Sequence, residues 1–441
     1  MQNTDHLYTI RELIDQHKMS IFQWRIILIC FFIVLLDGFD IAIVAYIAPI
    51  LKKEMILAPN HLPYLFTSGV LGLMLGSMLF GPLADIFGRK KVLVISTLLY
   101  GTSTILCGFV DTFPSLVGFR FFTGLGLGGA MPISIALCAE YSPQRYRMML
   151  CTLSWSGFTL GIATGGIIAN IILEQLTWHW LFYIGGILPL LTIILIIAAL
   201  PESLEYLLKQ TNEPNKQTLQ RIIKNIVQEK IPSSLSLQHS DIEQSHRTVK
   251  LLLTKDNRKV TLLLWLSFFL SLGIFYLLTY WIPILFEGIY SFQKVNLLTT
   301  MLPIGGTIGA FLLAWWIDHY KKPFAILSFS YLLACVLLLC VVGIVENYAF
   351  LLLTILLIGF SIAGAQNSLN LVAATIYPAY IRTTGVSWAM ANGRLGSIIG
   401  SYIGVWLAGD KQLDIFFNAL SIGAFICGIT LLSIHRTKHS H

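Results

Sequence analysis

Two carboxylates lie in the middle of the first long apolar segment, where residues 36–40 are LDGFD. A charged side chain at the centre of a spanning helix costs about 2.5–3.5 kcal/mol, so such residues normally face a cavity or a partner and carry function. Asp37 and Asp40 are spaced i and i+3, which places them on nearly one face of a helix. Burial and the second nearby charge suit reversible protonation of one of them, so we predict a proton carrier. The alternative is a structural acid that a neighbouring helix satisfies.

Two arginines inside apolar segments are candidate partners for an anion. Arg120 precedes a glycine-rich stretch, and it could pair with Asp37 or Asp40, hold an anionic substrate, or extend to the membrane interface. Arg394 follows Asn392 and Gly393 in a later segment. A planar guanidinium suits a carboxylate better than an ammonium does, so Arg394 is the first candidate for an anion anchor. A structural contact between helices is the alternative for Arg394.

Uncharged polar side chains supply further candidate contacts with a substrate. Gln366, Asn367 and Asn370 place amides along one stretch of an apolar segment. Tyr276 and Tyr280 are further candidates in the seventh apolar segment. We predict that these five residues, with Arg120 and Arg394, line the substrate site.

A charged loop follows the second apolar segment. Residues 81–91 are GPLADIFGRKK, which combine the carboxylate of Asp85, a turn at Gly88 and cations that begin with Arg89. These residues suit a charge latch that breaks and reforms between conformations. Retention of the loop on one side of the membrane by its cations is the simpler alternative. Glu140, near Arg145 and Arg147, is expected either in a gate ion pair or with Asp37 and Asp40 in proton coupling.

Twelve apolar runs must position these residues. The chain has 441 residues, of which 56% are hydrophobic and only 12% charged, whereas soluble proteins have about a quarter charged. A spanning helix needs about 20 apolar residues. We therefore predict an all-α membrane protein with two six-helix bundles around a central cavity. The runs begin near Trp24, His61, Lys91, Ser115, Met149, Thr177, Val260, Val295, Pro323, Asn347, Thr384 and Leu413.

The basic residues predict the orientation of the chain. Loops rich in Lys and Arg stay in the cytoplasm, and most basic residues fall on one side if both termini are cytoplasmic. The basic residues in loops on the other side are Lys52, Lys53, Lys294 and Lys411. The formal net charge of +7 is scattered over loops, so it indicates a lipid bilayer and no nucleic acid as partner. We expect a multi-pass protein of the bacterial plasma (inner) membrane.

An internal repeat divides the chain. Residues 1–200 form an N-terminal half, 201–259 a polar cytoplasmic linker with short surface helices, and 260–441 a C-terminal half. A shift of about 234 positions aligns the two halves, for example Tyr46 with Tyr280, as parallel repeats require. At this shift Asp37 meets Ser271, so the acidic pair is confined to one half.

These motifs resemble those of the major facilitator superfamily and, more narrowly, of its aromatic acid:H+ symporter family. Residues 81–91 resemble the superfamily signature between helices two and three, and residues 120–126 its fourth-helix signature. Residues 36–40 are similar to the acidic first-helix motif of the aromatic acid symporters. Residues 373–378, followed by Arg382, residues 384–386 and residues 393–397, resemble further sequence of the same family. The resemblance spans nearly the whole membrane domain. Gly161–Ile162 replaces the Gly-Pro pair of the antiporters, which favours uptake by symport.

The resemblance implies roles for charged residues. Asp37 and Asp40 would couple protons, and Asp85 and Arg89 would support the conformational cycle. The resemblance also implies that four further residues are needed for transport, namely Arg120, Glu140, Arg382 and Arg394. Arg382 is grouped with Asp85, Gly88 and Arg89 as part of the conformational gate.

We therefore predict a secondary active transporter that imports a small organic carboxylate, more narrowly an aromatic one, together with a proton by alternating access. The expected partners are this organic anion and H+, and a monomer is expected. The proton gradient drives transport, so we expect no cofactor, no metal and no catalytic residue. One alternative is a symporter or facilitator for another organic anion, such as a dicarboxylate or sugar acid. Remoter alternatives are an intramembrane lipid-modifying enzyme, with Asp37 and Asp40 as metal ligands, and a non-transporting sensor.

Overall fold

Twelve long helical segments make up the body of the protein. The computed structural model describes residues 10–209, 213–227, 249–373, 376–377, 382–408 and 412–439. The first six segments are α2 (Ile21–Glu54), α3 (Leu62–Phe87), α4 (Arg89–Cys107), α5 (Phe113–Tyr141), α6 (Gln144–Gln175) and α7 (His179–Ala199). The last six are α10 (Lys255–Leu285), α11 (Phe292–Tyr320), α12 (Pro323–Cys340), α13 (Tyr348–Gly359) with its continuation, α15 (Arg382–Leu407) and α16 (Leu413–His439).

The tenth segment is not a uniform helix. It runs from α13 through a π-helical turn, η4 (Phe360–Gly364), into α14 (Ala365–Ala373). The hydroxyl of Ser330 in α12 donates a hydrogen bond of 3.0 Å to the carbonyl of Ser361 in this turn. This hydrogen bond ties the irregular turn to α12.

The observed segments agree with the predicted ones, and each begins within a few residues of the start expected from the sequence. Eleven of them are long and apolar enough to cross a membrane. The twelfth is α15, which is less apolar because it carries Arg382, Asn392 and Arg394. Among the described residues, extended structure is limited to one bridge between Glu287 and Tyr290. The predicted all-α membrane fold is thus confirmed.

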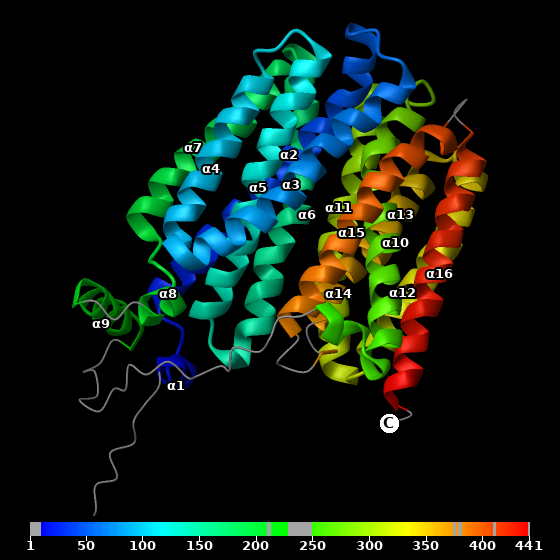
Figure 1. Ribbon diagram of the computed structural model, residues 1–441. Coiled ribbons are helices and arrows are strands. Elements are labelled where there is room, and N and C mark those ends of the chain that lie inside the picture. The colour runs from blue at the N-terminus through cyan, green and yellow to red at the C-terminus, as the bar shows by residue number, and fades with distance from the viewer. Residues whose placement is uncertain are drawn as a thin grey trace, which may run out of the picture.

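Helix packing repeats between the two parts of the chain. In the first part, α2 packs on α6, α3 on α5 and α4 on α7. In the second, α10 packs on α15, α11 on the tenth segment and α12 on α16. Figure 1 shows α2–α7 gathered on one side and α10–α16 on the other. We call these groups the N-bundle (α2–α7) and the C-bundle (α10–α16). Their equivalent pairings fit the internal repeat in the sequence.

Glycines allow two of these equivalent pairs to approach closely. A Cβ atom at Gly161 of α6 would overlap the backbone carbonyl of Leu35 in α2. A Cβ atom at Gly396 of α15 would likewise overlap the carbonyl of Phe269 in α10. Small residues at such positions let helix backbones touch inside a membrane. Gly161 and Gly396 therefore serve helix packing.

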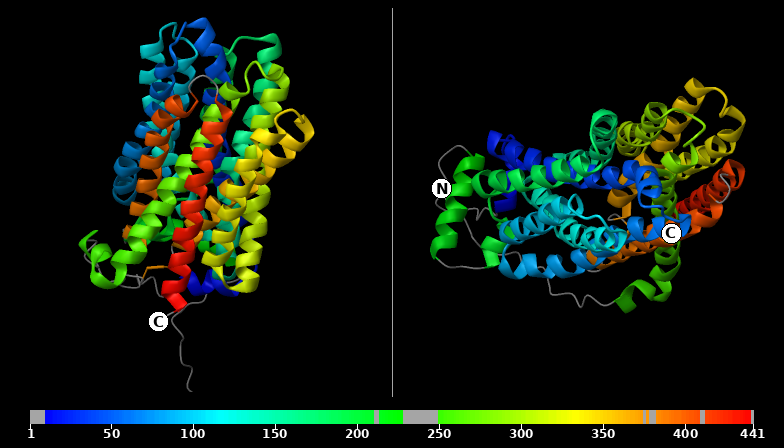
Figure 2. Two further views of the ribbon diagram at one scale, coloured as in Figure 1. Left: turned by 90° about the vertical axis from the view of Figure 1, so that its right-hand side faces the viewer. Right: turned by 90° about the horizontal axis from the view of Figure 1, so that it is seen from above.

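Shorter helices mark one end of the molecule. They are α1 (Ile10–Gln16), α8 (Leu204–Lys209) and α9 (Glu213–Val227). Figures 1 and 2 place them, together with the C-terminal end of α16, at the same end of the bundles, which we call the linker end. We call the opposite end, with residues 55–61 and 286–291, the far end. Helix α9 buries Leu219 and Ile223 against α1 and the N-bundle, so this part of the linker is docked.

Candidate functional site

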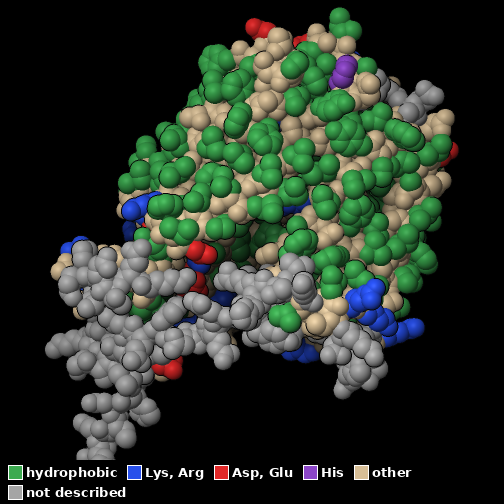
Figure 3. Space-filling view, viewed as in Figure 1, with side chains coloured by type: hydrophobic (Ala, Val, Ile, Leu, Met, Phe, Trp, Pro, Cys, Tyr) green, Lys and Arg blue, Asp and Glu red, His purple; other side chains and the backbone are tan. Residues whose placement is uncertain are grey.

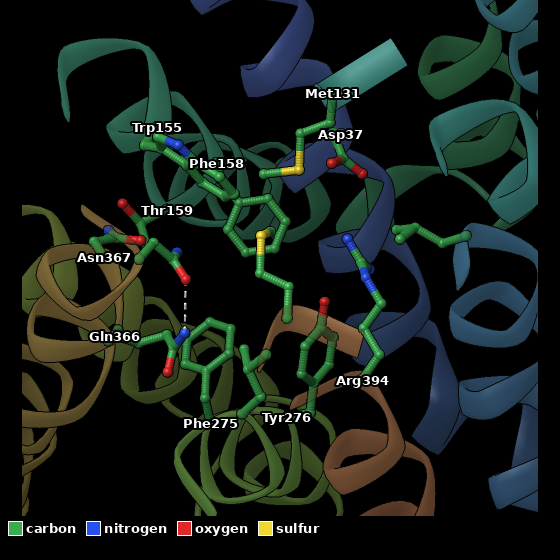
Figure 4. Close-up of a pocket in the computed structure, with 15 residues that line it drawn as sticks. Asp37, Met131, Trp155, Phe158, Thr159, Phe275, Tyr276, Gln366, Asn367 and Arg394 are labelled. Atoms are coloured by element: carbon green, nitrogen blue, oxygen red, sulfur yellow. Dashed lines mark hydrogen bonds between the residues drawn. The ribbon is translucent and has the colours of Figure 1, made fainter. Parts of the chain in front are cut away.

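A pocket lies between the two bundles, and both contribute to its wall. The N-bundle supplies side chains from α2, α3, α5 and α6, and the C-bundle from α10, the tenth segment and α15. Figure 4 shows how they converge. The lining residues are Asp37, Leu73, Met131, Trp155, Phe158, Thr159, Leu272, Phe275, Tyr276, Ala363, Gln366, Asn367, Asn370, Met390 and Arg394.

Asp37 is the acidic group of this pocket. It is 1% exposed, and neither carboxylate oxygen has a hydrogen-bond partner among the described residues. The next residue, Gly38, lies against the backbone carbonyl of Phe158, so α2 and α6 approach closely at this level. A buried carboxylate without a donor is energetically unfavourable in its ionised form. This geometry suits a group that takes up and releases a proton.

Arg394 supplies the positive charge among the described lining residues. It projects from α15, and Figure 4 shows its guanidinium on the same side of the pocket as Asp37. No ion pair or side-chain hydrogen bond holds this guanidinium among the residues that the structure describes. Its donors are therefore available to an anion that enters the pocket, which suits the predicted anchor.

Amides form the opposite side of the pocket. Gln366, Asn367 and Asn370 lie on α14, directly after the π-helical turn that sets the direction of this helix. Gln366 Nε2 donates a hydrogen bond of 3.1 Å to Asn370 Oδ1. Gln366 Oε1 and Asn367 Nδ2 are buried and have no hydrogen-bond partner among the described residues. One acceptor and one donor are thus left for a ligand.

Aromatic and sulfur-containing side chains complete the wall. Trp155 and Phe158 come from α6, Phe275 from α10 and Met390 from α15. Sequence reasoning did not identify these four residues. Aromatic residues make up 12% of the chain and occur in every apolar segment, so their types and spacing carry no specific signal. Tyr276, which the sequence does predict, lies in the same wall.

Asp40 does not share the environment of Asp37. Arg120 Nη1 lies 2.7 Å from Asp40 Oδ1 in an ion pair whose side chains are 4% and 1% exposed. The hydroxyl of Thr104 also donates to Asp40 Oδ1, at 3.4 Å. Three residues along a helix turn the side chain by about 60°, so Asp40 faces α4 and α5 whereas Asp37 faces the pocket.

This arrangement corrects two expectations. Arg120 was predicted to line the substrate site, with a pair to Asp37 or Asp40 as an alternative. The structure shows the pair with Asp40, and Arg120 does not line the pocket. Tyr280 was predicted to contact the substrate as well. It is instead stacked on Phe66 of the N-bundle, with ring centroids 4.4 Å apart, and it is also absent from the lining.

The buried ion pair gives a stability prediction. We expect Arg120→Leu to lower the free energy of unfolding by about 3–5 kcal/mol, because Asp40 would be left as an uncompensated buried charge. The double variant Arg120→Leu/Asp40→Asn should recover much of this loss. Thermal unfolding of the purified variants in detergent measures both effects. Equal destabilisation of the single and double variants would contradict the proposed cause.

A second charged network lies at the linker end. Arg89 forms ion pairs with Glu140 of α5 and, at 2.9 Å, with Glu205 of α8. Glu140 also accepts hydrogen bonds from the Ser203 hydroxyl at 2.8 Å and the Leu204 N–H at 3.0 Å. This network ties α4 and α5 to the start of the linker.

The network differs from the predicted latch. Asp85 is exposed and forms no ion pair with Arg89 in the described structure, because Glu140 and Glu205 take its place. Glu140 was expected either in a gate ion pair or in proton coupling. It lies in an ion pair, with Arg89, and does not line the pocket. Gly88 has φ of 99°, a backbone conformation that favours glycine and separates α3 from α4. Arg382 begins α15, and its side chain lies outside the described residues.

Contacts between the bundles hold the far end together, whereas Figure 3 shows a hollow between the bundles toward the linker end. The far-end contacts join α2 and α6 to α11 and to the loop that precedes it. They are Lys53–Glu287 at 2.6 Å, Tyr46–Thr300 at 2.8 Å, Asn170–Asn296 at 3.3 Å and Glu174–Gln293 at 3.2 Å. The arrangement therefore suits a pocket that is closed toward the far end.

Comparison with known proteins identifies the family of this chain. A family model described as the Major Facilitator Superfamily matches residues 30–439. The chain belongs to the major facilitator superfamily. Members of this superfamily similar to the chain are transporters, so the chain is a membrane transporter and not an enzyme.

Several superfamily members share 30% or more of their residues with the chain. The 4-hydroxybenzoate transporter of Acinetobacter baylyi is 35% identical over 434 residues, which cover 97% of this chain and 94% of that protein. The gallate transporter of Pseudomonas putida is 32% identical, with 96% and 94% covered. The benzoate transport protein of A. baylyi is 30% identical, with 97% and 92% covered.

A solved structure in the superfamily shares the fold. The xylose transporter of E. coli, in a partially occluded inward open conformation, superimposes with a TM-score of 0.73 at 18% identity. The match covers 96% of this chain and 98% of the xylose transporter. The likeness establishes the twelve-helix architecture of the superfamily in this chain.

Proposed function

We propose that this protein carries a small aromatic carboxylate across the membrane together with a proton. The observation that carries the proposal is a pocket between the bundles with aromatic walls, in which neither Asp37 nor Arg394 has an ion-pair or side-chain hydrogen-bond partner among the described residues. Aromatic rings bind other rings through their faces and edges, and Arg binds carboxylates in two-pronged geometry. The named substrates of the relatives, 4-hydroxybenzoate, gallate and benzoate, are aromatic carboxylates.

The positions of Asp37 and Arg394 give a reason for coupling. An ionised Asp37 repels a carboxylate that enters the same pocket and competes with it for the field of Arg394. Protonation of Asp37 removes both effects, so bound proton increases the affinity for the substrate. By thermodynamic linkage, bound substrate increases the affinity for the proton by the same factor. The loaded pocket has one proton and one anion more than the empty one, so its net charge is unchanged.

Alternating access follows from movement of the two bundles. The far-end contacts would break and the hollow at the linker end would close when the transporter changes state. We assign residues 1–200 and 260–441 to the two moving halves and 201–259 to the linker. We propose that the linker end and both termini face the cytoplasm of a bacterial cell and that the protein lies in its inner membrane, because loops rich in Lys and Arg stay in the cytoplasm. A monomer provides the complete pocket.

Uptake by proteoliposomes tests this function. Purified protein is reconstituted, and a pH gradient that is acid outside is imposed. We expect accumulation of radiolabelled 4-hydroxybenzoate or benzoate above the equilibrium level, and loss of this accumulation when a protonophore is added. Uptake of labelled aliphatic dicarboxylates or sugar acids, with no uptake of the aromatic acids, would instead show a transporter for another organic anion.

A further inference from the structure

The two sides of the pocket have different chemistry. Arg394 and Asp37 lie on one side, and the amides of Gln366 and Asn367 lie on the opposite side, with the ring of Phe158 between them (Figure 4). A carboxylate is matched by the cationic side. The amide side carries no charge, so it suits a neutral polar group at the other end of the same ligand.

The amide side is unusual because its hydrogen bonds are incomplete. Gln366 and Asn367 are 5% and 6% exposed, yet Gln366 Oε1 and Asn367 Nδ2 have no partner among the described residues. The bond from Gln366 Nε2 to Asn370 Oδ1 fixes the orientation of the Gln366 amide and directs its own oxygen elsewhere. Buried amide groups without partners are unfavourable, so a ligand that satisfies them gains binding energy.

A hydroxyl group has the chemistry that these two atoms require. It can donate its proton to an oxygen such as Gln366 Oε1, and it can accept a hydrogen bond from an N–H group such as that of Asn367 Nδ2. A bare ring edge does neither and leaves both amides unsatisfied. A site built to hydrogen-bond a hydroxyl rejects the analogue that lacks it more strongly than an apolar pocket rejects an extra methylene.

We propose that Gln366 and Asn367 select aromatic carboxylates that carry a hydroxyl on the side of the ring away from the carboxylate. This inference rests on the proposed function and narrows its substrate class. The carboxylate binds Arg394, the ring lies beside Phe158, and the distal hydroxyl reaches the amides. Benzoate fills the same pocket but binds more weakly, because it leaves the amides without partners.

Three acids test the proposal with the unaltered protein. Dissociation constants are measured by calorimetry for 4-hydroxybenzoate, benzoate and 2-hydroxybenzoate. We expect 4-hydroxybenzoate to bind about tenfold more tightly than the other two. The 2-hydroxyl lies beside the carboxylate and cannot reach the amides, so it controls for a general effect of ring hydroxylation. Equal binding of the 2- and 4-hydroxy acids would overturn the proposal.

A variant then assigns the preference to the amide. Asn367→Leu keeps the approximate size of the side chain and removes its donor. We expect it to weaken binding of 4-hydroxybenzoate about tenfold and to change benzoate binding less than about twofold. A folding defect would weaken both acids alike, so the ratio isolates the hydroxyl contact. The matched control is Asn392→Leu, because Asn392 lies outside the lining and donates to a carbonyl of its own helix.

The outcomes separate this inference from the proposed function. A preference for 4-hydroxybenzoate that Asn367→Leu removes and Asn392→Leu retains supports the selection by the amides. An unchanged preference in Asn367→Leu overturns it, while uptake of aromatic acids leaves the proposed function intact. Absence of binding and uptake for all three acids overturns the proposed function itself.

Discussion

Proteoliposomes that contain Asp37→Asn are expected to lose gradient-driven accumulation of the aromatic acid. A pH difference of one unit corresponds to about 1.4 kcal/mol, so cotransport of one proton with each substrate supports about tenfold accumulation in the unaltered protein. Asparagine has the shape of aspartic acid but carries no ionisable proton. Asp37 lines the pocket, and neither of its carboxylate oxygens has a partner among the described residues, so the substitution breaks no ion pair there. The variant should therefore equilibrate the substrate but not concentrate it.

Counterflow separates lost coupling from lost folding. Exchange of labelled for unlabelled substrate needs no net movement of protons, so Asp37→Asn should retain it. Asp414→Asn provides a matched control, because Asp414 is exposed at the start of α16, outside the pocket. Accumulation by Asp37→Asn at the level of the unaltered protein would rule out Asp37 as the coupling group.

Arg394→Met is expected to weaken binding of the aromatic carboxylate about a hundredfold. Hydrogen bonds to charged groups contribute about 1.5–3 kcal/mol, and the substrate would lose the positive charge of the described lining. Methionine retains an unbranched, flexible side chain, so the change mainly removes charge and donors. Calorimetry with purified protein gives the dissociation constant directly, and uptake should fall in parallel.

Lysine at the same position separates charge from geometry. Arg394→Lys keeps the positive charge but cannot form two parallel hydrogen bonds with a carboxylate, so we expect intermediate affinity. Arg436→Met is the matched control, since Arg436 is exposed near the end of α16. Arg394→Met with the affinity of the unaltered protein would refute the anchor.

Coupling and anchoring use different members of the charged set that the sequence contains. Asp37 and Arg394 share the pocket, whereas Asp40 and Arg120 form a buried pair beside it. The difference explains why substitutions at the two sites should have different effects. Asp37→Asn affects coupling to the gradient, whereas loss of Arg120 leaves Asp40 uncompensated and affects stability.

The amino-acid sequence by itself determined the twelve helical segments and the residues that merit attention. Apolar runs of about 20 residues are governed by the thickness of the bilayer, which acts on each segment alone. A charge within such a run is conspicuous for the same reason, so Asp37, Asp40, Arg120 and Arg394 are visible without a structure. The amides of α14 were also found, because polar side chains stand out among apolar neighbours.

Only the tertiary structure decided which of these residues meet. The side chains of Asp37 and Asp40 differ by about 60° around α2, and that rotation sends one to the pocket and the other to Arg120. Likewise, Arg89 pairs with Glu140 and Glu205 and not with Asp85. Trp155 and Phe158 gave no signal, because an aromatic residue in an apolar helix can face lipid, core or cavity. These choices depend on helix rotation and packing between distant segments, which spacing along one segment does not specify.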